Sequence, residues 1–342
     1  MQDSHQPVKA FPPICFLVVL VISLALNGCK GNDSSASGGD SWDYTTRLDY
    51  GRAPVWSPDG DMIAFGDDRP GNAGIFLYNL EDEPVQIATD VPAHNWDYSF
   101  SPEGSQVLFS CPGGVNDSSA GIWVYTLDTD SSVKVYSQGK DVCWFKDNAH
   151  IIFRQDNPVG SAPGLYLLQI ADDSSGIGLP ELIMENGHKP AIAQRTGYIA
   201  YIENERSGFL HVLDDQLTPL FTSDRGVVDF KWSANGKVLA YIINDYVTGE
   251  LSGELWSISD NDWTTPNDQA LFAAYCSPDS AGAQIAYSRW AASRWVGLWL
   301  VREPNYNEQI APYGLFPVFN PRADKIASNA PNGGIRILTR AG

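Results

Sequence analysis

A short segment recurs along the chain at a regular spacing. Residues 54–65 read PVWSPDGDMIAF, and residues 98–109 read YSFSPEGSQVLF. Seven such segments align on one marker position, and successive markers are 44, 44, 48, 40, 44 and 43 residues apart. The markers are Trp56, Phe100, Trp144, Ile192, Trp232, Cys276 and Phe319. A period of about 40 to 45 residues indicates a repeat architecture in which every unit has the same structure.

The residues after each marker predict a hairpin. After Trp56 come SPDG and the apolar run MIAF. In this turn the Ser57 side chain can bond back to the backbone, Pro58 presets φ, and Gly60 permits a positive φ. A turn of this kind between two apolar runs is a hairpin signal.

A second landmark gives the rest of the unit. Each marker is followed by a glycine that opens another apolar strand, at Gly74, Gly121, Gly164, Gly208, Gly253, Gly297 and Gly334. A weaker fourth strand follows, such as VQIAT at 85–89. Four strands per unit predict an all-β fold over residues 43–342, a seven-bladed β-propeller of four-stranded blades. We expect the N-terminal strand, 43–51, to close the last blade, because an open ring would leave an exposed sheet edge.

The N-terminus has the pattern of an export signal. Residues 14–26, ICFLVVLVISLAL, are too few to cross a bilayer, which takes about 20 apolar residues. They fit the apolar region of a secretory signal, and Leu26-Asn27-Gly28-Cys29 resembles a bacterial lipobox. We therefore expect a signal peptide at 1–28 and a lipid on Cys29; the alternative is an ordinary signal peptide with a chance cysteine.

Residues 29–42 are rich in Ser and Gly and predict a flexible tether. A lipid on Cys29 would anchor the protein to a membrane of the bacterial cell envelope. Lys30, rather than aspartate, follows Cys29, which by the sorting habit of enteric-type lipoproteins suggests the outer membrane.

The net charge limits the partners. A formal charge of −19 repels phosphate backbones, so we expect no nucleic-acid binding. It also repels anionic lipid surfaces, which leaves the acyl chains as the membrane anchor.

The remaining cysteines are Cys111, Cys143 and Cys276, without CxxC spacing. An odd number gives no complete disulfide framework, so we expect inert buried thiols. A Cys111–Cys143 bridge is the alternative. We expect no cofactor, and leave a divalent cation open.

The string SPDG-x-x-IAF-x-DDRPGNAGIFLYNL, at 57–80, resembles the TolB-type propeller repeat, also called the WD40-like PD40 repeat. The resemblance covers residues 43–342 and implies the fold more than a function. Similar repeats occur in the Tol–Pal envelope protein, in prolyl oligopeptidase-like peptidases and in oligogalacturonate lyases. This chain has no G-x-S-x-G elbow and no closely spaced histidine pair, so no functional residue is carried over.

Ligands of propellers usually bind where the loops entering the innermost strands converge. Polar residues at those loops are Arg52, His94, Trp96, Lys140, His188 and Lys189. One interpretation is an anionic or peptide ligand with Trp96 as a stacking platform. The other, which we favour, is that these charges pair with Asp97, Asp141 and Asp229.

The sequence contains no nucleophile beside a base. We therefore expect a monomeric, non-catalytic envelope lipoprotein whose propeller binds a protein or peptide. The alternative is a polysaccharide lyase or hydrolase with its site at the channel mouth. Arg52, Lys140 and His188 would then neutralise the carboxylate of a uronate.

Overall fold

The computed structural model describes residues 42–89, 97–111, 119–156, 158, 160–170, 177–204, 208–245, 250–257, 262–264, 273–279, 284–291, 294–302, 306–330 and 333–340. The predicted signal peptide and Cys29 lie outside these residues. No helix long and apolar enough to span a membrane occurs within the described ranges. The predicted all-β class is confirmed, because every regular element described is a strand.

The strands form six antiparallel sheets, five of which have four strands. Three of these five are β2 to β5 (Arg52–Trp56, Ile63–Asp67, Gly74–Tyr78, Val85–Thr89), β6 to β9 (Tyr98–Phe100, Gln106–Cys111, Gly121–Thr126, Ser131–Tyr136) and β10 to β13 (Lys140–Trp144, His150–Gln155, Gly164–Gln169, Glu181–Glu185). The other two are β21 to β24 (Ala273–Pro278, Gln284–Ala291, Arg294–Arg302, Tyr306–Ala311) and β25 to β27 with β1 (Leu315–Phe319, Lys325–Asn329, Ile335–Arg340, Trp42–Leu48).

The sixth sheet has seven strands. These are β14 to β20 (His188–Ile192, Ile199–Ile202, Gly208–Leu213, Pro219–Trp232, Val238–Asp245, Glu250–Ser257, Asp262–Thr264). The prediction of seven four-stranded blades is therefore wrong: the described residues form a propeller of six blades, one of which holds both the fourth and the fifth sequence repeat.

The strand β17 causes this difference. It runs for 14 residues without a break, and its Val227 pairs with Gly208 of β16 on one side and with Ile243 of β18 on the other. Elsewhere the chain leaves extended structure between blades at a glycine, with a positive φ at Gly51 (96°) and Gly139 (143°) and without one at Gly187 and Gly314. Gly226, the corresponding glycine of β17, lies inside the continuous strand that joins the two repeats.

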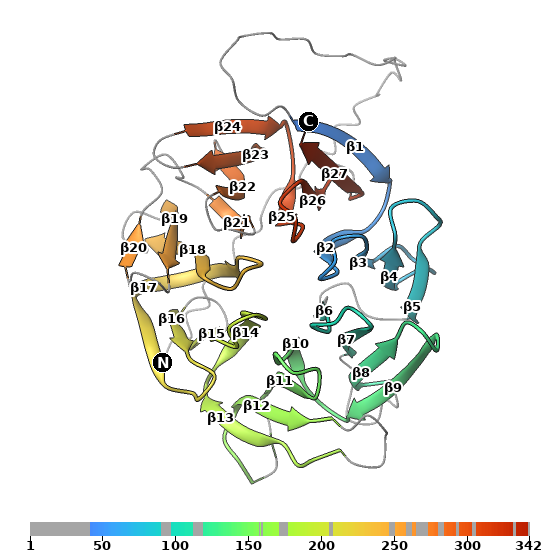
Figure 1. Ribbon diagram of the computed structural model, residues 1–342, viewed down its shortest axis with the longest axis vertical. Helices are drawn as coiled ribbons and strands as arrows, with labels where there is room; N and C mark the ends of the chain where they lie inside the picture. Colours follow the sequence, from blue (N-terminus) through green and yellow to red (C-terminus); the bar gives the residue numbers. More distant parts are fainter. Residues whose placement is uncertain are drawn as a thin grey trace, which may run out of the picture. The chain divides into compact units, whose positions relative to one another are not determined.

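The predicted closure by the N-terminal strand is present. β1 pairs with β27, from Trp42 opposite Arg340 to Leu48 opposite Ile335. The beginning and the end of the propeller are thus held in one sheet, as Figure 1 shows. This pairing leaves no open edge at the junction of the ring.

The sheets surround a common centre (Figure 1). The innermost strands contact one another around the ring, in the order β2, β6, β10, β14, β17, β21 and β25, and β25 contacts β2. The core lies between neighbouring blades. For example, Trp144 of β10 packs with Leu108 and Ile122 of the preceding blade. Burying a large apolar side chain in this way contributes about 1.5–3 kcal/mol.

No disulfide joins Cys111 and Cys143. Cys143 is buried, and that burial raises the pKa of its thiol well above the ordinary value. The expectation of an inert buried thiol at this position is confirmed, because a raised pKa keeps the sulfur in its unreactive protonated form.

Candidate functional site

The central channel has two chemically different ends. We call the end where the chain enters the innermost strands the loop end. It carries the predicted site residues, with Arg52, Lys140 and His188 each opening an inner strand and Lys189 following. The predicted residues His94 and Trp96 lie outside the described residues.

The two exposed cations that open strands at the loop end are ion-paired. The Arg52 guanidinium lies 3.4 Å from the Asp68 carboxylate, and the Lys140 ammonium lies 2.8 Å from Asp156. Arg154 also donates to Asp156, at 2.6 Å. Burial opposes ionisation of Asp156, but the hydrogen bond from Lys140 and the charge of Arg154 hold its pKa below the ordinary value. A ligand anion would compete with these carboxylates.

The backbone of the loop end is tied from blade to blade. Ala53, Asp141 and Lys189 each take a left-handed conformation, with φ of 50°, 51° and 49°. In each case the amide N–H group donates to a side chain of the preceding blade. The pairs are Ala53 to Asn329 (3.0 Å), Asp141 to Asp97 (2.8 Å) and Lys189 to Asp141 (3.2 Å). Left-handed conformations are costly for residues with a Cβ, and such capping bonds offset that cost.

One of the carboxylates that accept these backbone hydrogen bonds, Asp97, has an altered pKa. Burial and the charge of Asp141 raise the pKa of Asp97 above its ordinary value, although the Asp97 carboxylate accepts from the Asp141 amide and from the Ser110 hydroxyl. His188 is only 8% exposed. The loop end therefore brings the predicted residues together, but as a network of paired and buried groups. Whether they bind a ligand stays a prediction.

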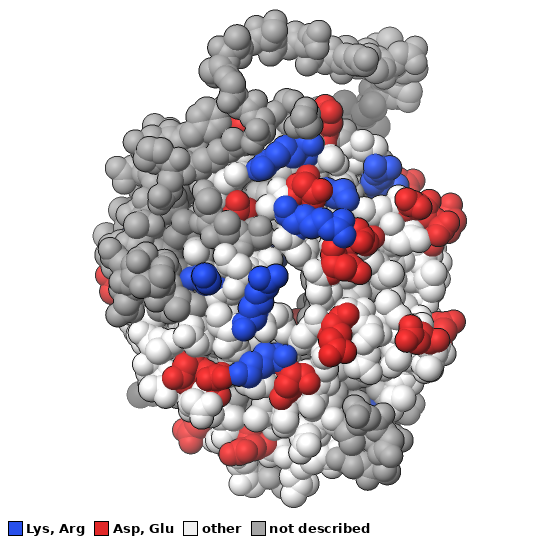
Figure 2. Space-filling view, in the orientation of Figure 1, with Lys and Arg blue, Asp and Glu red and all other residues white. Residues whose placement is uncertain are grey.

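A cavity lies at the opposite end of the channel, which we call the turn end because the hairpin turns after the markers surround it. Its volume is about 810 Å³. Figure 2 shows this face, with a hollow at its centre and basic side chains near the hollow. The lining residues come from five turns or the strands before them: Val55, Trp56, Ser57, Pro58, Ser99, Phe100, Ser101, Pro102, Gln194, Arg195, Ala234, Asn235 and Pro321.

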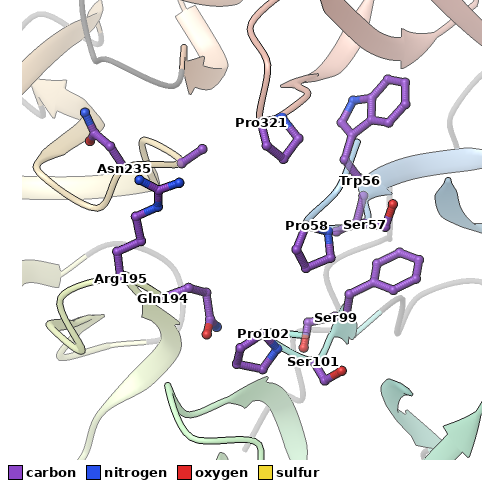
Figure 3. Close-up of a pocket in the computed structure, with 13 residues that line it drawn as sticks. Trp56, Ser57, Pro58, Ser99, Ser101, Pro102, Gln194, Arg195, Asn235 and Pro321 are labelled. Atoms are coloured by element: carbon purple, nitrogen blue, oxygen red, sulfur yellow. The ribbon is translucent and has the colours of Figure 1, made fainter. Parts of the chain in front are cut away.

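The cavity has two unlike walls (Figure 3). Three proline rings, Pro58, Pro102 and Pro321, form one side, because their turns have the sequences SPDG, SPEG and NPRA. Gln194 and Arg195 face them from the turn AQRT, which lacks the proline. One wall is thus rigid and apolar, and the other offers a cation and an amide.

Arg195 is the charged member of the lining. Figure 3 shows its guanidinium directed toward the cavity. Within the described part of the chain, no carboxylate lies at ion-pair distance from it. Two other cations on this face are paired: Arg322 lies 2.7 Å from Asp61, and Lys146 contacts Asp215. The hydrogen bond from Arg322 lowers the pKa of Asp61.

The residue three positions after each marker is a sequence signal that bears on Arg195, and the loop-end residues alone do not reveal it. Three residues after the marker, the turns place an acidic residue at Asp59, Glu103, Asp147 and Asp279. Asp59 uses its carboxylate within the turn, accepting from the Ser57 hydroxyl and the Asp61 amide. The fifth repeat has Asn235 at this position, and the fourth and seventh have Arg195 and Arg322, of which Arg322 pairs with Asp61.

Within the described ranges, no three His, Cys, Asp or Glu side chains lie close enough together to hold a metal ion.

No protein-family model and no curated protein matches the chain. The fold is similar to solved propellers at low sequence identity. An oligogalacturonate lyase in complex with manganese is 12% identical with a TM-score of 0.66, over 90% of this chain and 96% of that one. The oligogalacturonate lyase of Vibrio parahaemolyticus is 12% identical with a TM-score of 0.63, over 87% and 97%. The Cps50 (Swd1) propeller domain of Myceliophteria thermophila is 13% identical with a TM-score of 0.58, over 85% and 96%. At these identities the likeness shows the β-propeller fold.

Proposed function

We propose that the propeller binds an acidic ligand in the turn-end cavity, through an ion pair between Arg195 and a carboxylate of the ligand. The observation that carries this proposal is a cation directed into a cavity, with no carboxylate partner among the described residues, in a chain of net charge −19. A cavity of 810 Å³ lies within the range of about 300–1,000 Å³ common for small-ligand sites.

The chemistry of Arg195 favours a carboxylate. A guanidinium can bind both oxygens of a carboxylate through two parallel hydrogen bonds. A hydrogen bond to a charged group contributes about 1.5–3 kcal/mol. The proline wall, Pro58, Pro102 and Pro321, suits the apolar face of such a ligand and loses little entropy on binding, because its rings are already fixed.

The ligand class we propose is an oligosaccharide of uronic acids. Each uronate carries one carboxylate for Arg195. The likeness of this fold to two oligogalacturonate lyases supports the choice, as a fold-level analogy.

The manganese named with one of those lyases does not fit the residues described here. No three ligating side chains meet within the described ranges, and none of the cavity residues is His, Cys, Asp or Glu. We therefore assign no step to a metal, and Arg195 takes the role of holding the carboxylate.

Lyase activity is a second candidate, favoured by the two solved lyase structures. Elimination from a uronate needs a base beside the carboxylate. The lining residues that the structure describes include no Asp, Glu, His, Lys or Tyr to accept that proton. The described geometry thus supports binding more directly than elimination. Binding of an acidic protein or peptide by a lipid-anchored chain, as expected from the sequence, is a separate outcome of the same test.

The test compares two variants that each remove one positive charge, Arg195→Gln and Lys237→Gln. Lys237 is an exposed cation that does not line the cavity, so it controls for net charge. We expect saturable binding of oligogalacturonate by calorimetry, weakened about tenfold or more in Arg195→Gln and unchanged in Lys237→Gln. Absence of saturable binding, or equal effects in both variants, would contradict the proposal. Ultraviolet absorbance of an unsaturated product in the same mixtures reports elimination.

A further inference from the structure

A second hollow lies between the third blade, β10 to β13, and the adjoining first repeat of the seven-stranded sheet (Figure 1). We call it the interblade pocket. Its volume is about 230 Å³, below the range of about 300–1,000 Å³ common for small-ligand sites, so it suits a single side chain. Six of its eight lining residues are apolar. The lining residues are Phe145, Ile152, Leu167, Ile183, Ile199, Asp215, Gln216 and Leu217.

Exposed apolar side chains are concentrated on the two blades that form this pocket. Among the described residues, six large apolar side chains are exposed, and four of them belong to these blades. The four are Leu179 before β13, Phe209 on β16, Leu217 in the turn after β16, and Leu220 on β17. Single exposed apolar residues are ordinary on protein surfaces, but a group of them around an apolar pocket marks an interaction surface.

The turn that carries Leu217 is held in one conformation. The Asp214 carboxylate accepts from the Gln216 amide at 2.9 Å and from the Thr218 amide at 2.7 Å. Leu217 takes a left-handed conformation, with φ of 62°, which is costly for a residue with a Cβ. The hydrogen bonds to Asp214 offset that cost. One wall of the pocket is therefore preorganised, which lowers the entropy lost on binding.

The face of the fourth repeat that borders the pocket also carries a carboxylate. Alternate residues of a strand point to opposite faces, and Leu210 packs with residues of the fifth repeat, so Phe209 and His211 face the third blade. His211 stacks on Tyr201, with ring centroids 5.0 Å apart, and Tyr201 packs against the third blade. The His211 imidazole lies 3.4 Å from the carboxylate of Glu203, whose side chain is 46% exposed. A partly exposed carboxylate thus lies on the same face as the pocket.

Acidic residues dominate the segments that border this face. The segments are residues 145–149, 181–185, 199–204 and 214–218. Their carboxylates are Asp147, Glu181, Glu185, Glu203, Asp214 and Asp215. Their one cation is Lys146, which pairs with Asp215. In a chain of net charge −19, this surface attracts cations and repels a second copy of the protein, so charge complementarity favours a positively charged partner.

We infer that this face docks an extended peptide of a partner protein, with one large apolar side chain in the interblade pocket and a lysine or arginine beside Glu203. The spacing defines the peptide. Glu203 follows Ile199 of the pocket by four residues, and an extended chain rises about 3.3 Å per residue, so the two points are about 13 Å apart. In an extended peptide, side chains four residues apart point the same way and span the same length. The site is separate from the Arg195 cavity and does not depend on it.

The test measures the fluorescence anisotropy of the labelled peptide GLTSTKG, in which leucine and lysine stand four residues apart, in the presence of the whole chain. Two matched peptides replace the leucine by serine or the lysine by glutamine. Leu217→Ala removes apolar surface from the pocket, and Glu203→Gln removes the carboxylate. Val133→Ala and Glu81→Gln are the controls, because both residues are exposed on other blades. Thermal denaturation of each variant verifies the fold.

We expect the wild type to bind the peptide that carries both leucine and lysine. Leu217→Ala should weaken this binding about fivefold and Glu203→Gln about threefold, with both controls unchanged. Glu203→Gln should not alter binding of the glutamine peptide, because the charge pair is already absent from that complex.

Three outcomes would overturn the inference. One is that the wild type does not bind the peptide, or binds the serine peptide equally well. Another is that Leu217→Ala and Glu203→Gln bind as the controls do. The third is self-association of the wild type, measured by sedimentation and abolished in Leu217→Ala, because the occupant of the pocket would then be a second copy of the chain.

Discussion

The two ends of the channel differ in how their charges are compensated. At the loop end, Arg52 and Lys140 face Asp68 and Asp156 across 3.4 Å and 2.8 Å. The turn end has Arg195 without a carboxylate partner among the described residues, in a defined cavity. The number of basic residues at an end of the channel therefore says little about anion binding until their ion-pair partners are known.

The largest expected effect comes from Gly51→Ala, at the loop end. Gly51 has φ of +96°, and an added Cβ would lie 2.5 Å from the Phe65 ring. We expect a loss of about 3 kcal/mol in the free energy of unfolding, measured by chemical denaturation. Gly71→Ala, with φ of +84° and no atom within 4 Å, is the control and should lose about 1 kcal/mol.

The affinity of the folded Gly51→Ala variant for oligogalacturonate shows which end of the channel binds the ligand. If the turn end alone binds the ligand, the folded variant should keep the wild-type affinity. A large loss of affinity in a folded Gly51→Ala protein would place the ligand at the loop end instead.

The next largest expected effect is weaker binding of oligogalacturonate by the variant Arg195→Glu. Replacing the cation by a carboxylate should weaken oligogalacturonate binding by about a hundredfold, since it removes an attraction and adds a repulsion. Calorimetric titration measures it. The matching reversal Lys140→Glu at the loop end should change the affinity by less than about threefold. The reverse order of the two effects would refute our assignment of the ends.

A smaller effect distinguishes the marker tryptophans. Trp56→Phe removes a buried hydrogen bond to Val318, so the free energy of unfolding should fall by about 1 kcal/mol more than in Trp144→Phe. Trp144→Phe removes a donor that has no partner in the unliganded fold. Denaturant titrations of both variants measure the difference; equal losses would mean that the Trp144 indole is satisfied in solution.

The smallest change is expected from Asp97→Asn, which keeps the shape and an acceptor oxygen. Burial and Asp141 raise the pKa of Asp97, so in the wild type the folded state binds its proton more tightly than the unfolded state does. Its contribution to stability is present at low pH and is lost as the pH rises through the raised pKa. Asp97→Asn should therefore flatten the decline of stability above the ordinary carboxyl pKa of 3.8, in a pH series of denaturant titrations. An unchanged slope would contradict this.

The repeat made most of the fold predictable. The markers Trp56, Phe100 and Trp144 each end an inner strand, and the turn signals follow them as expected. The closing role of the N-terminal strand followed from a missing fourth strand at the C-terminus. Periodicity could not predict the merging of two repeats, because a glycine stands at the corresponding position both where a blade ends, as at Gly187, and where the strand continues, as at Gly226.

The candidate site was harder to predict, for a physical reason. The pairing of Lys140 with Asp156 joins residues of different strands, and sequence spacing does not reveal it. Arg195 was visible as a departure from the acidic residue of four other turns, but Arg322 shares that departure, so the sequence alone did not single out Arg195.

The strand β17 has a consequence for how the ring can open. At the other junctions that the structure describes, between β1 and β2, β9 and β10, β13 and β14, and β24 and β25, the extended structure is interrupted, and a local fluctuation can separate the repeats there. Between Pro219 and Trp232 the strand is continuous: its residues up to Val227 pair with β16, and those from Val227 onward pair with β18. Because one continuous strand belongs to both repeats, they should lose protection from hydrogen exchange together, as one cooperative unit.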